Sequence, residues 1–150
     1  MEDTVKTPMH LWVVGILSLL WNCFGAYDYT MTRMRNVDYL SQVPGVSAEQ
    51  MLAYVDSLPI WCQVGWGLGV WGALLGSILL LMRSRHAFTA FAVSFIGMIM
   101  SLGYEMTGMA PSGPDAMHQG AMAMMPWFIM IVGVALLYYS WAQKKNGVLR

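Results

Sequence analysis

The chain has 150 residues, of which 57% are hydrophobic and 11% are charged. This composition is too apolar for a soluble domain of the same length, so much of the surface is expected to face lipid. Eight basic and eight acidic residues give a formal net charge of zero, which excludes the broad basic surface that a nucleic-acid partner requires.

Four apolar windows are long enough to cross a membrane. A spanning helix needs about 20 mostly apolar residues, and none of the four windows contains Lys or Arg. Aromatic residues stand near the ends of each window, where they prefer the headgroup zone. We expect spans at His10–Tyr29, Pro59–Met82, His86–Tyr104 and Met122–Ala142. Residues 1–150 are therefore expected to form a single all-α domain, a polytopic four-transmembrane-helix bundle.

The basic residues are unevenly divided between the two sides of such a bundle. Only Arg33 and Arg35 lie on the side away from the termini. Because Lys and Arg are enriched in cytoplasmic loops, we expect both termini in the cytoplasm of a bacterial cell and the chain in its inner membrane. The six basic residues on the expected cytoplasmic side are Lys6, Arg83, Arg85, Lys144, Lys145 and Arg150.

The two loops on the expected periplasmic side differ in character. Residues 30–58 contain Ser47 and Gln50 at the spacing of a capping box, which begins a helix. Apolar residues follow at helical intervals as far as Ser57, so we expect a short helix along the periplasmic interface. Residues 105–121 contain glycines and prolines in close succession, which predict an irregular loop.

Small residues follow one face of each of the first three spans. Such stripes let helix backbones approach closely in lipid, where apolar surface gives little drive for association. In the second span the glycines recur at steps of four, three and four residues, which is one continuous face. We expect the stripes to pack helices in a tight bundle or a dimer: Gly15, Ser18, Asn22 and Ala26 in the first span, Gly65, Gly69, Gly72 and Gly76 in the second, Ser94, Gly97 and Ser101 in the third.

A few polar side chains fall at membrane depth, where ionisable groups are costly and often functional. Asp28 and Glu105 close the first and third spans on the same side, so they either line one outward vestibule or are solvated at the headgroup level. Asn22 lies about two turns deeper, where an interhelical hydrogen bond or a ligand contact suits it. With aromatic residues added, the candidate solute site is Trp21, Asn22, Asp28, Gln63, Trp66 and Glu105.

The second outer loop is rich in methionine. Thioether and imidazole groups are ligands that suit Cu(I), whereas methionine is also a flexible filler of apolar interiors. The candidate Cu(I) ligands are Met106, Met109, Met117 and His118. The sequence carries none of the nucleophile, zinc-hydrolase or phosphate-loop motifs, so we expect no enzyme and, Cu(I) aside, no cofactor.

Six segments carry a resemblance that covers most of the chain: Pro8–Gly15, Trp21–Asn22, Gly25–Thr32, Ala48–Tyr54, Gly69–Ser77 and Gly147–Arg150. Together they resemble a family of small four-helix bacterial inner-membrane proteins that are usually labelled sugar transporters. The resemblance implies a sugar-like substrate, although it implies no set of binding residues. The methionine-rich loop departs from the family's usual pattern and lies outside the resemblance.

Three functions are compatible with these patterns. A carrier of small, sugar-like solutes needs more than four helices to enclose a pathway, so it would act as an oligomer joined through the glycine stripe of the second span. An accessory or assembly subunit of a larger membrane complex also has close-packing faces and few buried charges. A periplasmic protein that handles Cu(I) is the third. The expected partners are the lipid bilayer and either further copies of the chain or other subunits.

Overall fold

The computed structural model describes residues 6–150, which fold into helices and contain no strand. In chain order the elements are α1 (Met9–Arg33), α2 (Val37–Leu40), α3 (Ala48–Ser57), α4 (Ile60–Leu81), α5 (His86–Met106), the 3-10 helix η1 (Asp115–His118) and α6 (Gly120–Lys145). Of these, α1, α4, α5 and α6 are long and apolar enough to cross a membrane. The chain is therefore an all-α, multi-pass membrane protein, and the predicted fold class is confirmed.

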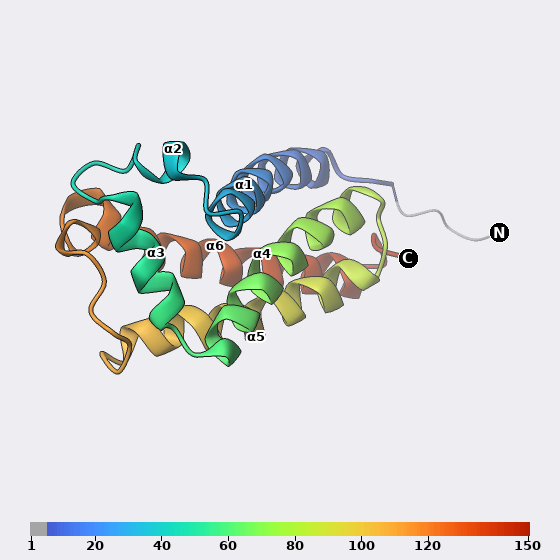
Figure 1. Ribbon diagram of the computed structural model, residues 1–150. Helices are drawn as coiled ribbons and strands as arrows, with labels where there is room; N and C mark the ends of the chain where they lie inside the picture. The colour runs from blue at the N-terminus through green and yellow to red at the C-terminus, as the bar shows by residue number, and fades with distance from the viewer. Residues whose placement is uncertain (1–5) are drawn as a thin grey trace.

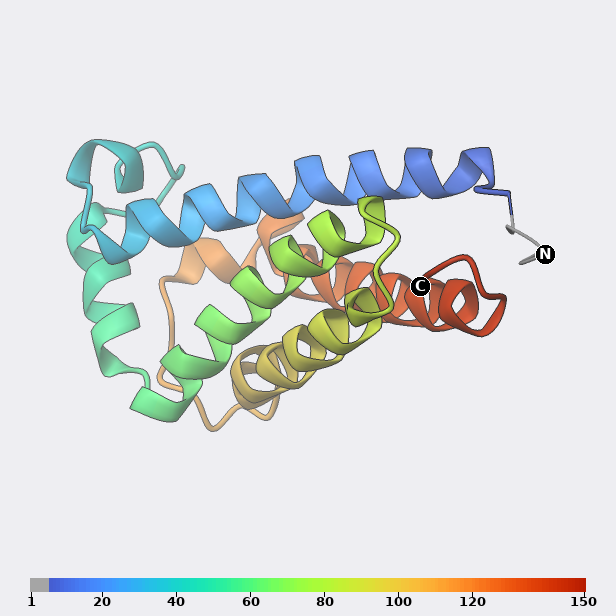
Figure 2. The same cartoon turned by 90° about the vertical axis from the view of Figure 1, so that its right-hand side faces the viewer.

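The four long helices pack as neighbours in the order α1, α4, α5, α6. The hairpin of α4 and α5 forms the most extensive interface, with α1 against α4 and α6 against α5 (Figure 1). Figure 2 shows α1 crossing α4 near the tight turn that follows α4, after which the two helices separate toward the end where α3 lies. We call these ends of the bundle the turn end and the α3 end.

The first span is longer than predicted. It runs four residues beyond the expected end at Tyr29, because no glycine or proline interrupts it and the Thr30 hydroxyl donates to the Ala26 carbonyl at 2.7 Å. The chain leaves helical geometry at Arg35, whose φ is 55°. The first loop therefore begins after Arg33 rather than at Thr30. The other three spans end within three residues of the predicted bounds.

The loops at the α3 end contain more structure than expected. The predicted helix is confirmed as α3, and its capping box joins Gln50 N to Ser47 Oγ at 3.1 Å and Ser47 N to Gln50 Oε1 at 3.0 Å. Helix α2 was not predicted; it begins after Asn36, whose side chain accepts a hydrogen bond from Tyr39 N at 2.9 Å. Helix η1 was not predicted either, so the second loop is not irregular throughout.

The turn end is closed by a compact apolar cluster. Its fully buried members include Leu11 of α1 and Leu80 of α4, together with Ala87 and Phe91 of α5. The last residues of the chain fold back onto this cluster, where Val148 and Leu149 are buried, and the backbones of Arg83 and Arg150 are joined by a hydrogen bond of 2.7 Å. The helices are thereby fixed to one another at this end.

Candidate functional site

The glycine stripe of α4 lies against α5 in the same chain. A Cβ added at Gly65 would lie 2.9 Å from the Gly97 carbonyl oxygen, and one added at Gly97 would lie 2.5 Å from the Gly65 oxygen. These distances show that the two backbones are in contact. The Ser94 hydroxyl strengthens the interface by donating to the Gly69 carbonyl at 2.6 Å.

The remaining stripe residues lie in the same interface. A Cβ at Gly72 would meet Ser94 at 3.0 Å, and one at Gly76 would meet the Phe91 ring at 2.7 Å. Ser101 is buried, and its carbonyl accepts a hydrogen bond from Cys62. The predicted helix packing is confirmed. Because α5 occupies this face of α4, the stripe offers no surface for the dimer contact that was also expected of it.

Asn22 ties α1 to α4. Its side chain is buried, and its Nδ2 donates to Ser77 Oγ at 2.8 Å and to the Ala73 carbonyl at 3.2 Å. Ser77 also donates to the Ala73 carbonyl, so the three residues form a small closed network. The interhelical hydrogen bond expected of Asn22 is confirmed, and both of its amide protons are used.

Gln63 has a similar bridging role at the α3 end. Its Oε1 accepts from Arg33 Nη1 at 2.7 Å, and its Nε2 donates to the Leu58 carbonyl at 2.9 Å. The amide thus connects the end of α1 with the segment that enters α4. Two tryptophans also bridge helices. Trp21 of α1 packs edge-on against Phe128 of α6 at 5.2 Å between ring centroids, and Trp66 of α4 packs against Tyr29 of α1.

Asp28 is bound by a tyrosine of the first loop. The Tyr39 hydroxyl donates to Asp28 Oδ1 at 2.7 Å, which fastens α2 to the last turns of α1. Burial raises the pKa of Tyr39 to about 12, with further contributions from the hydrogen bond to Asp28 and from its negative charge. The tyrosine therefore keeps its proton and remains the donor in this hydrogen bond.

Glu105 lies beside a different tyrosine. The hydroxyl of Tyr54, on α3, is near enough to the Glu105 carboxylate to interact with it. Burial is the main cause that raises the pKa of Tyr54, and the charge of Glu105 adds to it. The ring of Tyr54 also covers Gly113, and His118 of η1 is near enough to Glu105 to interact with its charge. Both loops at the α3 end therefore converge on Glu105.

The two acids that were expected to share a vestibule have different partners. Asp28 is tied to α2, and Glu105 lies beside α3 and η1. Neither tyrosine was a sequence candidate, because 11 residues separate Tyr39 from Asp28 and a much longer stretch separates Tyr54 from Glu105. No local spacing rule indicates such pairs, which only the folded chain brings together.

The four candidate Cu(I) ligands lie on three segments. Met106 ends α5, Met109 lies in the loop that follows, and Met117 and His118 belong to η1. Met109 is 75% exposed, whereas the Met117 sulfur packs near Gly113. Within the described residues, no group of three His, Cys, Asp or Glu side chains is arranged to hold a metal ion.

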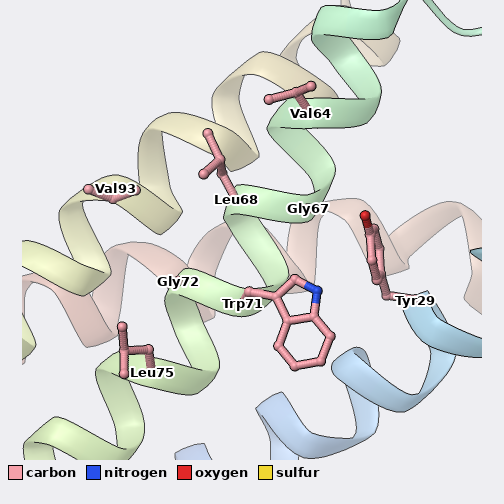
Figure 3. A pocket seen from close by; sticks show the side chains of 8 residues that line it. All are labelled: Tyr29, Val64, Gly67, Leu68, Trp71, Gly72, Leu75 and Val93. Carbon is pink, nitrogen blue, oxygen red and sulfur yellow. The ribbon is translucent and has the colours of Figure 1, made fainter.

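A groove lies over α4, between α1 and α5, where α1 separates from α4. Tyr29 of α1 and Val93 of α5 form its sides, and Gly67, Trp71 and Gly72 of α4 form its floor and one wall (Figure 3). Its volume is about 430 Å³, and it is open along one side. Trp66 packs on Tyr29 at 4.7 Å between ring centroids. We call this feature the lateral groove; the sequence analysis did not anticipate it.

The candidate solute residues are therefore distributed over separate contacts and do not form one site. Asn22 and Gln63 join α1 to α4, Trp21 joins α1 to α6, and Asp28 and Glu105 lie beside the loops at the α3 end. A scan of protein-family models and searches of curated proteins and of solved structures find no match for this chain.

Proposed function

We propose that this protein is an accessory subunit of a larger membrane complex in a bacterial inner membrane. One observation carries the proposal: the buried polar side chains of the long helices, such as Asn22 and Ser94, are bound to other parts of the same chain. The uneven placement of basic residues supports an orientation with the turn end in the cytoplasm and the α3 end in the periplasm.

A carrier needs polar side chains that face a passage and exchange their partners for a solute. Here the deepest polar side chain, that of Asn22, is buried and donates both amide protons to α4. The Ser94 hydroxyl of α5 likewise donates a hydrogen bond to α4, at the Gly69 carbonyl. Among the described residues, every fully buried side-chain nitrogen or oxygen has a hydrogen-bond partner. These contacts support a structural role for the bundle.

The surface for a partner subunit is best supplied by α6. Only 6% of the residues in its most apolar stretch are buried, against 22% to 28% in the other three long helices. The exposed side chains include Trp127, Phe128 and Val134, which are large and apolar. A neighbouring membrane helix that packs on this face would complete the bundle on the side that α5 leaves open.

A sugar carrier is the second candidate, and one observation favours it. At the α3 end Tyr29 packs edge-on against Trp66, and Gln63 lies one helical turn before Trp66 on α4, so aromatic rings and a polar amide occur together. In such a carrier a second copy of the chain would complete the passage, because four helices barely enclose one, and the resemblance to sugar transporters implies the substrate class. Neither candidate is an enzyme, and neither uses the methionine-rich loop.

The test is isolation of the tagged protein from native membranes in a mild detergent, followed by quantitative mass spectrometry. We expect one set of membrane proteins at fixed stoichiometry. Val134→Trp on α6 should lower their recovery about tenfold, the effect of losing one well-packed contact. Leu17→Trp, at a more exposed position on α1, is the control and should leave recovery unchanged.

A different result would contradict the accessory role. If the protein purifies without partners and, alone in liposomes, takes up a labelled neutral sugar faster than empty liposomes, the accessory role is wrong. The carrier would then take its place.

A further inference from the structure

The lateral groove has the dimensions of a ligand site. Its volume of about 430 Å³ falls within the range of roughly 300–1,000 Å³ that is common for small-molecule sites. Its lining is apolar, with Val64, Leu68 and Leu75 on α4 and Val93 on α5. It lies on membrane-spanning helices and opens sideways, so the molecule that fills it comes from the bilayer (Figure 3).

Two polar atoms face this apolar groove. The Tyr29 hydroxyl lies 2.9 Å from the position that a Cβ at Gly67 would take, so glycine leaves room for it. Figure 3 shows the indole nitrogen of Trp71 on the same side of the groove. In the described part of the chain neither donor has a hydrogen-bond partner. Because an unpaired donor is costly in hydrocarbon, both require an acceptor from the occupant of the groove.

A cation stands above the groove toward the α3 end. Arg33 follows Tyr29 by four residues, which places both on one face of α1 about 6 Å apart along the helix. Its Nη1 donates to Gln63 Oε1 at 2.7 Å, so the guanidinium reaches across the gap to α4, one helical turn before the groove residue Gly67. A guanidinium has five N–H donors. The Arg33 side chain is exposed, and its remaining donors are available to an anion.

We propose that the lateral groove binds one glycerophospholipid from the leaflet at the α3 end. Arg33 holds its phosphate, the Tyr29 hydroxyl and the Trp71 indole donate to an ester carbonyl, and one acyl chain lies along Leu68 and Leu75. The distance along α1 from Tyr29 to Arg33 suits the separation of the ester and the phosphate within one lipid. Arginine is also well matched to phosphate oxygens. This inference does not depend on the proposed function.

Binding is tested by native mass spectrometry of the purified protein titrated with dioleoylphosphatidylglycerol in detergent. A Cβ at Gly67 would lie 2.9 Å from the Tyr29 hydroxyl oxygen, so Gly67→Leu pushes the Tyr29 side chain and its donor out of place, and lipid binding should weaken by about tenfold or more. Gly25→Leu adds the same side chain to α1, where nothing lies within 4 Å. This control should bind the lipid as the wild type does.

The polar contacts are tested with two milder variants. Tyr29→Phe should weaken binding about two- to tenfold, the effect of one lost hydrogen bond, while Tyr138→Phe on the exposed face of α6 should have no effect. Arg33→Gln should weaken binding of dioleoylphosphatidylglycerol but not of dioleoylglycerol, which has the same acyl chains and no phosphate.

Equal lipid retention by the wild type, Gly67→Leu and Tyr29→Phe would overturn the proposal. So would an equal loss in Gly67→Leu and Gly25→Leu, because that result describes a general lipid shell around the helices. A loss in Arg33→Gln that is the same for both lipids would contradict the assignment of the phosphate to Arg33.

Discussion

The two faces of α4 meet their neighbours in different ways. Toward α5, Gly65 and Gly69 bring the two backbones into contact. Toward α1, at the α3 end, Trp66 and Trp71 reach across a gap to the ring of Tyr29, and the lateral groove remains open. Lipid gives little drive for helix association, so the size of the side chains on each face sets how closely the helices approach. One helix thus has a sealed face and an open face.

The largest effect is expected on the sealed face. In Gly97→Ala the new Cβ would lie 2.5 Å from the Gly65 oxygen and 2.6 Å from Gly69 N. Backbone cannot move aside as a side chain can, so the free energy of unfolding should fall by about 1–3 kcal/mol. This free energy is measured by unfolding the protein in mixed micelles. The control Gly25→Ala has open space and should be unchanged or slightly stabilised, because alanine favours helix.

A smaller effect is expected where α1 crosses α4 at the turn end. The Cβ of Gly15→Ala would meet the end of the Leu81 side chain, which can adopt another rotamer. We expect a loss of about 1 kcal/mol or less in the same unfolding assay. If this variant were as unstable as Gly97→Ala, close backbone contact would not be confined to the α4–α5 interface.

The smallest effect is expected in the loops. Tyr39→Phe removes one partly exposed hydrogen bond to Asp28 and should lower stability by less than about 1 kcal/mol at neutral pH. The Tyr39 pKa is raised from 10.0 to about 12 in the folded chain, so the unfolded chain releases this proton first. Its contribution is present below pH 10 and is lost as the pH rises to about 12.

The measurement is stability against pH for both proteins. Over that alkaline interval the wild type should lose more stability than Tyr39→Phe, and a tyrosinate titration should show one fewer late-titrating phenol in the variant. Parallel pH profiles would mean that Tyr39 is not held by Asp28.

The sequence predicts the fold well because the signals of a membrane bundle are local. Apolar length indicates the spans, and the stripe from Gly65 to Gly76 indicates a close-packed face. Ser47 and Gln50 mark the start of α3 through a pattern only four residues long. The continuation of α1 to Arg33 was missed because aspartate and threonine at a helix end resemble a loop when hydropathy alone is considered.

The site was less predictable because its contacts depend on which faces meet. Asn22 could be assigned to a helix contact, since its depth in the span restricts its alternatives. Asp28 and Glu105 have similar depth and similar neighbours in the sequence, yet each lies beside a tyrosine from a different loop helix. The lateral groove also depends on the separation of α1 from α4, which no sequence pattern gives.

The most direct test of this account is a double-mutant cycle on the hydrogen bond between Asn22 and Ser77. Stability is measured in mixed micelles for the wild type, Asn22→Ala, Ser77→Ala and the double variant. If this deep polar pair holds α1 to α4, the coupling free energy should be about 0.6–1.7 kcal/mol, the range known for interhelical hydrogen bonds in membranes. A coupling of zero would contradict the claim that the buried polar side chains act as helix ties.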